Sequence, residues 1–150
     1  MIIKTAPDTE NLKYLAANLR ASDIEEIKAG SALEPFECLQ KSVEISRESY
    51  VAVLEGRPCF IYGVQGEPGN YSIWLLGTPE VGKYPLDFMD FCRAELKRLM
   101  EKYGKLFNVI PEKNKRTISW LKALGARIDA DIVKLKNSDD NYRFFTFGGV

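Results

Sequence analysis

The spacing of hydrophobic residues changes along this 150-residue chain, and that change constrains the fold more than any single motif. In the first third, apolar residues such as Leu12, Leu15 and Leu19 recur at helical spacing. From Tyr50 onward, short apolar runs bounded by turn residues alternate with two further helical stretches. Strands and helices in this order predict an α/β fold, with helices packed against a central sheet.

Residues that typically begin or end helices locate the expected helices along the chain. Asp8 suits the N-cap of the first helix, and Pro35 suits the first turn of the third. Either Ser22 or Asp23 can cap the helix between them, which Gly30 closes. No repeat or Pro/Gly-rich linker divides the chain, which predicts one domain over residues 1–150. We expect helices at residues 9–20, 23–30, 33–46, 85–104 and 115–124, and strands at residues 2–5, 50–54, 59–64, 71–77, 106–110, 126–135 and 142–147.

The charge balance and the lack of histidine exclude several classes of function. Lys plus Arg and Asp plus Glu number 21 each, so the formal net charge is zero. A dedicated nucleic-acid-binding protein would carry a basic excess. Without histidine, the chain lacks the commonest general base, the Ser-His and Cys-His nucleophile pairs and most zinc sites. We therefore expect no dedicated nucleic-acid partner and no metal.

The cysteines and the apolar runs indicate a reducing compartment. Cys38, Cys59 and Cys92 are widely spaced and form no CxxC pair, so we expect reduced thiols that behave as small core residues. The start of the chain turns polar too quickly for a signal peptide, and no apolar run reaches membrane-spanning length. These features predict a cytoplasmic protein without a membrane segment.

The segment from Asn114 to Gly125 joins a helix cap to a glycine stop. Asn114 can cap a helix, and Gly125 can adopt the left-handed conformation that ends one. In this spacing the segment resembles the fourth-helix motif of the GNAT family of N-acetyltransferases. In that motif an Asn follows the fifth strand, and a Gly closes the helix.

The C-terminal half is also similar to the internal virion protein A family, a group of small GNAT-like podovirus proteins. The similarity rests on residues 106–109 (Leu-Phe-Asn-Val), 119–126 and 144–147 (Phe-Phe-Thr-Phe). Residues 75–78 (Leu-Leu-Gly-Thr) are typical of related phage acetyltransferase-like proteins. The resemblance covers the last half of the chain in its residues and the first half in its pattern. It implies a bacteriophage protein of the host cytoplasm or of the virion.

The GNAT resemblance implies a mixed central sheet of about six to seven strands flanked by helices. Residues 71–77 and 106–110 match the fourth and fifth strands of that fold, which are parallel and splay apart. GNAT enzymes bind acetyl-CoA between these strands, with its pyrophosphate on backbone N–H groups of the loop into the next helix. The resemblance therefore implies acetyl-CoA as cofactor and an amine as acceptor.

The expected phosphate loop, from Thr78 to Pro85, departs from the family pattern Gln/Arg-x-x-Gly-x-Gly/Ala. It holds one glycine, Gly82, followed by the cation Lys83, and its prolines, Pro79 among them, donate no N–H. The loop either cradles phosphates with Thr78, Gly82 and Lys83 or is an ordinary connection in which Pro85 opens a helix.

Further cofactor contacts follow from the resemblance. Leu76 and Gly77 end the fourth strand and join the expected contacts, together with Asn114. Asn114 either hydrogen-bonds the pantetheine arm of the cofactor or only caps its helix. Trp74 and Trp120 either line an acceptor pocket or pack in the core.

The catalytic residues implied by the resemblance are less complete. Many GNAT enzymes protonate the leaving thiolate with a Tyr at the position that Leu121 occupies, and Leu121 has no proton to donate. Tyr84 and Tyr103 are the candidate replacements, the second being better suited to the core. For the base, Glu67 precedes the fourth strand and Glu80 follows it, although each also suits a solvated turn. We take Glu80 and Tyr84 as the expected catalytic pair.

Two functions are compatible with the sequence. The first is an acetyl-CoA-dependent N-acetyltransferase in which an amine attacks the thioester directly. The second is a GNAT-fold phage protein that has lost catalysis and serves virion assembly or binds phage or host proteins. The missing tyrosine and glycines favour the second function, whereas a pocket between splayed strands would favour the first.

Overall fold

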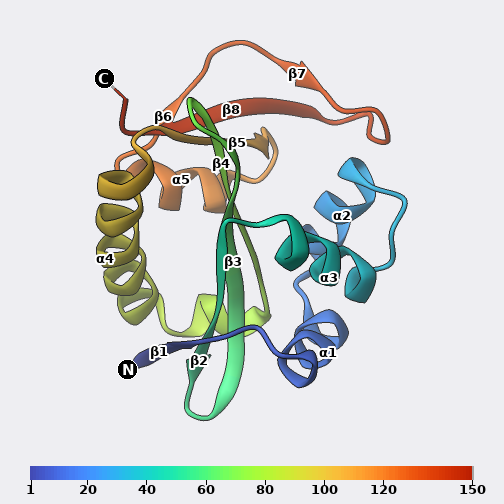
Figure 1. Cartoon of the computed structure of the whole chain (residues 1–150). Helices are drawn as coiled ribbons and strands as arrows, with labels where there is room; N and C mark the ends of the chain where they lie inside the picture. The colour runs from blue at the N-terminus through green and yellow to red at the C-terminus, as the bar shows by residue number, and fades with distance from the viewer. Residues whose placement is uncertain (150) are drawn as a thin grey trace.

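The computed structural model describes residues 1–149 and centres on one eight-stranded mixed sheet (Figure 1). The strands are β1 (Ile2–Thr5), β2 (Glu48–Leu54), β3 (Arg57–Glu67), β4 (Asn70–Gly77), β5 (Leu106–Pro111), β6 (Arg127–Ile128), β7 (Val133–Lys134) and β8 (Asn141–Phe147). The helices are α1 (Thr9–Asn18), α2 (Ala21–Gly30), α3 (Pro35–Ile45), α4 (Pro85–Tyr103), α5 (Lys115–Ala123) and the 3₁₀-helix η1 (Pro79–Lys83). The strand order is β1-β2-β3-β4-β5-β8-β6, and β7 also pairs with β8.

Helices cover both faces of the sheet (Figure 1). On one face, α1, α2 and α3 pack through a core that includes the fully buried Leu15, Leu39 and Ile61. On the other face, α4 and α5 pack on residues such as Phe60, and Leu99 of α4 is fully buried there. Apolar stripes on helices and on both sheet faces thus form two core layers, which confirms the expected α/β architecture.

The long helix α4 joins the two parallel strands of the sheet. Pro85 occupies its first turn, and its buried stripe is Phe88, Cys92, Leu96 and Leu99, as the helical spacing predicts. β4 and β5 lie side by side and run parallel, whereas the other strand pairs are antiparallel. A parallel pair needs such a crossover connection, and α4 supplies it.

The start of α2 differs from the prediction. Neither Ser22 nor Asp23 caps this helix, because it begins at Ala21, directly after the extended residue Arg20. Asp23 lies in the first turn and is buried, with its carboxylate accepting two hydrogen bonds from the Arg20 guanidinium, at 2.9 and 3.1 Å. A tertiary ion pair therefore takes the side chain that the sequence suggested as a cap.

The expected strand over residues 126–135 is also wrong, since it is broken into the two-residue strands β6 and β7. Both pair with β8, but the segment between them leaves the ladder. The Arg143 guanidinium donates to the carbonyl oxygens of Asp129 and Ala130, at 3.1 and 3.0 Å. These side-chain hydrogen bonds satisfy backbone groups that a continuous strand would have paired.

The three thiols behave as the sequence predicts. Cys59 and Cys92 are buried, Cys38 is half-buried, and none forms a disulfide within residues 1–149. Burial raises the pKa of Cys59 to about 11 and that of Cys92 to about 12, so both stay neutral thiols in the core. In the described part of the chain, no helix has the length and apolar character needed to cross a bilayer.

Candidate functional site

The parallel strands β4 and β5 form a fork. Their ladder holds only two residue pairs, Tyr71 with Leu106 and Ser72 with Phe107. Beyond these pairs, β4 stays with β3 up to Gly77, and β5 stays with β8, so the two strands diverge toward their C-terminal ends. The splayed parallel pair predicted from the sequence is therefore confirmed.

One side chain closes the base of the fork. Asn108 is the first residue of β5 beyond the ladder, and its Nδ2 donates to the Ile73 carbonyl oxygen at 2.6 Å. Its Oδ1 accepts the N–H of Val109 at 2.8 Å. The amide side chain replaces the next backbone hydrogen bond of the ladder and fixes where the strands separate.

Above Asn108, the backbone of β4 faces an open space. In a strand, alternate residues direct their N–H and C=O groups to the same side, and Ile73 and Gly77 direct theirs away from β3. Leu75, between them, therefore directs its N–H and C=O into the fork, where β5 has already diverged. This amide is a hydrogen-bond donor available to a ligand.

A cavity of about 390 Å³ occupies the fork. Its lining comes from both faces of the sheet, so the cavity reaches through the fork from α2 and α3 to α4 and α5. The walls are mostly apolar, with three acidic side chains among them. Residues that line it include Asp23, Glu26, Ile27, Cys38, Trp74, Leu76, Phe88, Glu95, Leu96, Trp120 and Leu121.

Asp23 fastens helix α2 to the end of β4. Its Oδ2 accepts the backbone N–H of Gly77 at 2.7 Å, and the Arg20 N–H donates to the Gly77 carbonyl at 2.9 Å. The carboxylate is almost fully buried, and its Arg20 partner balances its charge. These contacts hold α2 along the open edge of the fork.

Glu26 lies one helical turn after Asp23 and lines the same cavity. Burial raises the pKa of Glu26 to about 8, the Asp23 carboxylate adds to the rise, and the Arg20 cation offsets part of it. Its carboxyl accepts no hydrogen bond from residues 1–149. Glu26 is thus a carboxyl group that can exchange a proton near neutral pH.

Several backbone N–H groups of the loop between β4 and α4 already form hydrogen bonds within the protein. The Thr78 N–H donates to the Cys59 carbonyl at 2.9 Å, and the buried Thr78 hydroxyl accepts the Glu80 N–H at 3.3 Å. The Val81 N–H donates to the Thr78 carbonyl at 3.2 Å. With Pro79 donating nothing, few amides in this turn remain for an anion.

Cationic side chains lie where the loop meets α5. The Arg116 guanidinium donates to the Gly82 carbonyl at 3.4 Å and stacks 5.0 Å from the centre of the Trp120 ring. Arg20 approaches the same ring, at 5.9 Å. The exposed Lys83 pairs with Glu80 at 2.9 Å. Neither cation lines the cavity, but Arg116, stacked on the cavity-lining Trp120, and Lys83, in the loop that Arg116 contacts, can hold an anionic group beside the fork.

Comparison with solved structures identifies this architecture. A GNAT-family acetyltransferase from Bacillus anthracis superposes with a TM-score of 0.74 at 11% identity, covering 98% of this chain and 94% of the other. The chain has the GNAT fold. A spermidine N-acetyltransferase from Vibrio cholerae, in complex with CoA and spermine, gives 0.71 at 9% identity, covering 98% and 95%.

The ribosomal-protein-S18-alanine N-acetyltransferase of Escherichia coli has the same GNAT fold, with a TM-score of 0.67 at 13% identity, covering 99% of this chain and 94% of the other. No family sequence model and no curated protein sequence matches the chain. The GNAT fold therefore rests on three-dimensional structure, including the fork.

Some residues expected to act in a GNAT site do line the fork cavity. Leu76, Trp74 and Trp120 are among its walls, with the two tryptophans on opposite faces of the sheet. Leu121 is half-buried and lines the cavity from α5. Its correspondence to the usual tyrosine position of the family stays a prediction.

The expected catalytic pair lies elsewhere. Glu80 and Tyr84 line a separate, small hollow beside the β2–β3 turn, and neither lines the fork cavity. The Tyr84 hydroxyl lies 3.5 Å from a Glu55 carboxylate oxygen. The other candidates also lie outside the cavity: Glu67 is exposed at the end of β3, and Tyr103 hydrogen-bonds Glu48 at 2.6 Å. No catalytic contact supports these residues.

The remaining expected cofactor contacts have structural partners of their own. Asn114 caps α5, accepting the Thr117 N–H at 3.3 Å, and does not line the cavity. Gly77 donates its N–H to Asp23, and Thr78 is buried. Gly82 lies under Arg116, whose guanidinium a Cβ at that position would meet at 2.8 Å. Their roles toward a cofactor stay predictions.

Sequence reasoning missed Glu26, Asn108 and Arg116 as site residues. The signal for Glu26 was present, because Asp23, Glu26, Ile27 and Gly30 share one face of α2 at helical spacing. Two carboxylates on the helix face that carries the buried Ile27 indicate buried charges with a function. Asn108 gave a similar signal, since it interrupts the apolar run of β5 on the face of the buried Leu106 and Ile110.

Proposed function

We propose that this protein is an acetyl-CoA-dependent N-acetyltransferase whose thioester site is the fork between β4 and β5. The observation that carries the proposal is the free backbone edge of Leu75 above Asn108, which faces a cavity open to both sides of the sheet. One side can receive a thioester and the other an amine, so the reacting atoms meet at the fork.

The residues present fit this cofactor. The pantetheine arm is extended and amide-bearing, and one of its N–H groups can donate to the Leu75 carbonyl oxygen on the edge of β4. The Leu75 N–H points at the position where negative charge develops on the thioester oxygen during attack. Arg116 and Lys83 would hold the diphosphate by side-chain charge, because the turn at Thr78 offers few amides.

Acetyl-CoA supplies an activated acetyl group that is electrophilic at its carbonyl carbon. The protein's part is to orient the thioester, to exclude water from the fork and to remove a proton from the amine. Leu121 offers no proton at its position on α5, so the leaving sulfur takes its proton from water. Catalytic roles for Glu80 and Tyr84 would require the loop to rearrange, since both lie outside the cavity.

Calorimetric titration with acetyl-CoA tests the proposal without knowledge of the acceptor. We expect saturable binding with a dissociation constant in the micromolar range, and competition by CoA. Asn114→Ala should lower the melting temperature by loss of a helix cap, worth about 0.5–2 kcal/mol, and its affinity for acetyl-CoA shows whether Asn114 also contacts the cofactor. No heat at millimolar acetyl-CoA would contradict the proposal.

A second candidate function is a GNAT-fold phage protein that acts in the virion or binds host proteins without catalysis. The specific observation in its favour is that Asp23 and Cys59 already occupy the N–H groups of Gly77 and Thr78. Leu121 adds to it, since this position offers no acid. An absence of acetyl-CoA binding would support this alternative.

A further inference from the structure

We infer that Glu26 is the general base of the transfer and that the acceptor is a primary amine carried on a single apolar body. This inference rests on the proposed function and names the substrate class of the same site. It follows from the position of α2, from the contacts of the two α2 carboxylates that line the cavity and from the composition of the cavity wall on that side.

Helix α2 presents Glu26 to the fork. Asp23, Glu26, Ile27 and Gly30 all line the cavity, so this stripe of α2 runs along it. Asp23 is fixed to the Gly77 N–H at the C-terminal end of β4, at 2.7 Å. One turn further along the helix, Glu26 lies on the α2 side of the fork, opposite the α4 and α5 wall.

Glu26 differs from the other acidic side chains of the cavity in having no hydrogen-bond or ion-pair partner among residues 1–149. Asp23 accepts hydrogen bonds from Arg20 and Gly77 through both oxygens. Glu95, on α4, pairs with Arg98 at 2.9 Å and with Lys4 at 3.0 Å. Among the acidic residues that line the cavity, only Glu26 has a carboxylate available to an incoming ammonium group.

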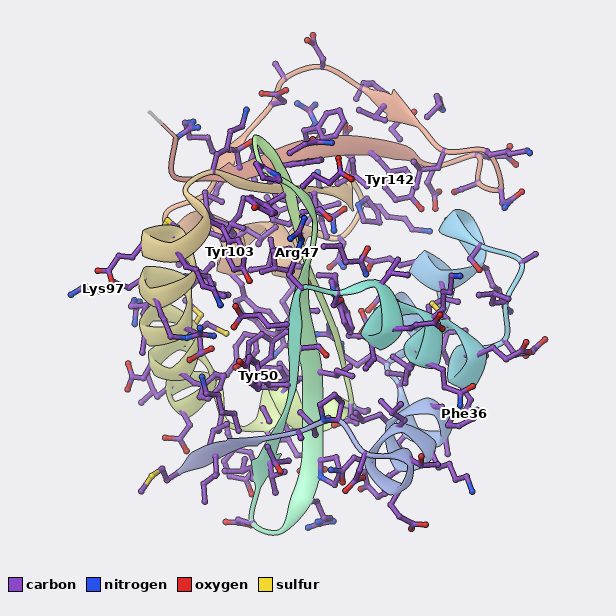
Figure 2. All side chains as sticks on the ribbon, viewed as in Figure 1. Phe36, Arg47, Tyr50, Lys97, Tyr103 and Tyr142 are labelled. Atoms are coloured by element: carbon purple, nitrogen blue, oxygen red, sulfur yellow. The ribbon has the colours of Figure 1, made fainter. Side chains whose placement is uncertain are left out.

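The other titratable groups around Glu26 leave this role to it. On α3, burial raises the pKa of the Cys38 thiol, which keeps it neutral. From β8, Tyr142 reaches the cavity on the side of α2 (Figure 2). Lys113 pairs with Glu25 of α2 and with Asp140, at 3.3 and 3.0 Å, and does not line the cavity. The raised pKa of Glu26, about 8, suits a base that works near neutral pH.

The proton balance of the step is complete. The Glu26 carboxylate accepts one proton from the ammonium form of the acceptor, which frees a nitrogen lone pair. That nitrogen forms a bond to the thioester carbonyl carbon, and the carbon–sulfur bond breaks. The sulfur takes a proton from water, and the amide nitrogen and Glu26 return theirs to solvent. The net products are an acetamide, CoA thiol and one proton.

The cavity wall on the α2 side selects the class of acceptor. Beside Glu26 the wall is uncharged and includes Ile27, Ser31, Cys38, Ser42, Trp74 and Leu135. One ammonium group can meet the Glu26 carboxylate, whereas a second ammonium along the same chain would meet an uncharged wall without a counter-charge. The site therefore fits an aryl-alkyl monoamine such as 2-phenylethylamine and disfavours a polyamine such as spermidine.

Replacing one carboxylate oxygen of Glu26 by an amide nitrogen removes its basicity and keeps the size of the side chain, so it tests Glu26 as the base. With 2-phenylethylamine and acetyl-CoA, Glu26→Gln should reduce acetyl transfer about 100-fold or more, because general bases contribute that much. Its dissociation constant for acetyl-CoA should change less than twofold. The matched control is Glu25→Gln on the exposed side of α2, which should keep full transfer. Equal transfer by Glu26→Gln and wild type would overturn the inference.

A titration that needs no turnover tests the same site. In protein with ¹³C-labelled glutamate, the Glu26 carboxyl, assigned by its loss in Glu26→Gln, should titrate near pH 8. Addition of 2-phenylethylammonium should lower that pKa, and equimolar spermidine should not. A Glu26 pKa near 4.5, or an equal response to both amines, would overturn the inference. Because this readout omits acetyl-CoA, a protein that shows it without binding acetyl-CoA contradicts the proposed function alone.

Discussion

The Asn108 Nδ2 atom donates a hydrogen bond to the Ile73 carbonyl oxygen across the fork, over 2.6 Å. The bond lies directly beyond the last ladder pair of β4 and β5. It marks the point where a parallel sheet gives way to an open cavity. Asn suits the position because its side chain carries both a donor and an acceptor, and the Val109 N–H uses the acceptor.

Asn108→Asp should weaken the fork. The substitution exchanges the donor for a carboxylate oxygen that faces the Ile73 carbonyl, and a half-buried unsatisfied polar pair costs about 1–3 kcal/mol. Urea denaturation should show this loss in the free energy of unfolding. Asn108→Ser, smaller and still a donor, should cost less; an Asp variant as stable as wild type would mean that this contact does not hold the strands.

A network of charged and tyrosine side chains between β2 and α4 predicts a pH dependence of stability. Burial alone would raise the pKa of Glu48, but hydrogen bonds from Lys102, Tyr103, Arg98 and Tyr50 outweigh it and lower the pKa to about 2. Tyr50 of β2 and Tyr103, the last residue of α4, lie on the same side of the sheet (Figure 2). The network thereby ties β2 to α4.

The sign follows from the direction of the shift. A carboxyl whose pKa is lower in the folded protein stabilises the fold above its unfolded pKa, 4.5, and loses that contribution as the pH falls toward 2. We expect wild type to lose about 2–3 kcal/mol more than Glu48→Gln between pH 5 and pH 2. The control Glu44→Gln, exposed on α3, should follow the wild-type curve. Chemical denaturation at each pH measures the difference.

Charge substitutions beside the fork should change the affinity for acetyl-CoA in opposite directions. Lys83→Glu and Arg116→Glu should each weaken binding several-fold, more so at low salt, because each replaces a cation near the diphosphate with an anion. Glu80→Gln removes the anion that pairs with Lys83 and should strengthen binding about twofold. Affinities indifferent to all three changes would place the phosphates elsewhere.

Leu121→Tyr should raise the transfer rate if loss of the thiol limits turnover. The side chain lines the cavity, so the larger ring can extend into open space without the about 1–3 kcal/mol that overpacking of a closed core costs. Transfer to 2-phenylethylamine and the melting temperature are the two measurements. An inactive variant with a much lower melting temperature would show that Leu121 is a packing residue.

The element order and the helix ends were largely predictable, because they depend on local chemistry. Asp8 and Asn114 cap their helices, and Gly104 and Gly125 adopt the positive φ expected of helix stops. The break within residues 126–135 was not predictable, since the carbonyl groups there bond to Arg143, which comes later in the chain. Local propensity carries no information on such a distant partner.

The site was less predictable than the fold. Glu80 and Tyr84 were chosen because they are adjacent in sequence to the end of β4, but η1 turns them toward the β2–β3 hairpin. Glu26 is distant in sequence and joins the fork through the contacts that Arg20 and Asp23 make with Gly77. The carboxylate that the site uses is thus set by a tertiary contact.

The amide resonance of Leu75 gives the most direct test of the central claim, that the fork binds a thioester through its β4 edge. In a ¹H–¹⁵N titration with acetyl-CoA, the account predicts a saturable downfield shift of the Leu75 amide proton, as expected when that N–H gains an acceptor. The Val64 amide, in the buried strand β3, serves as the reference and should not move. A Leu75 resonance unchanged at millimolar acetyl-CoA would contradict the account.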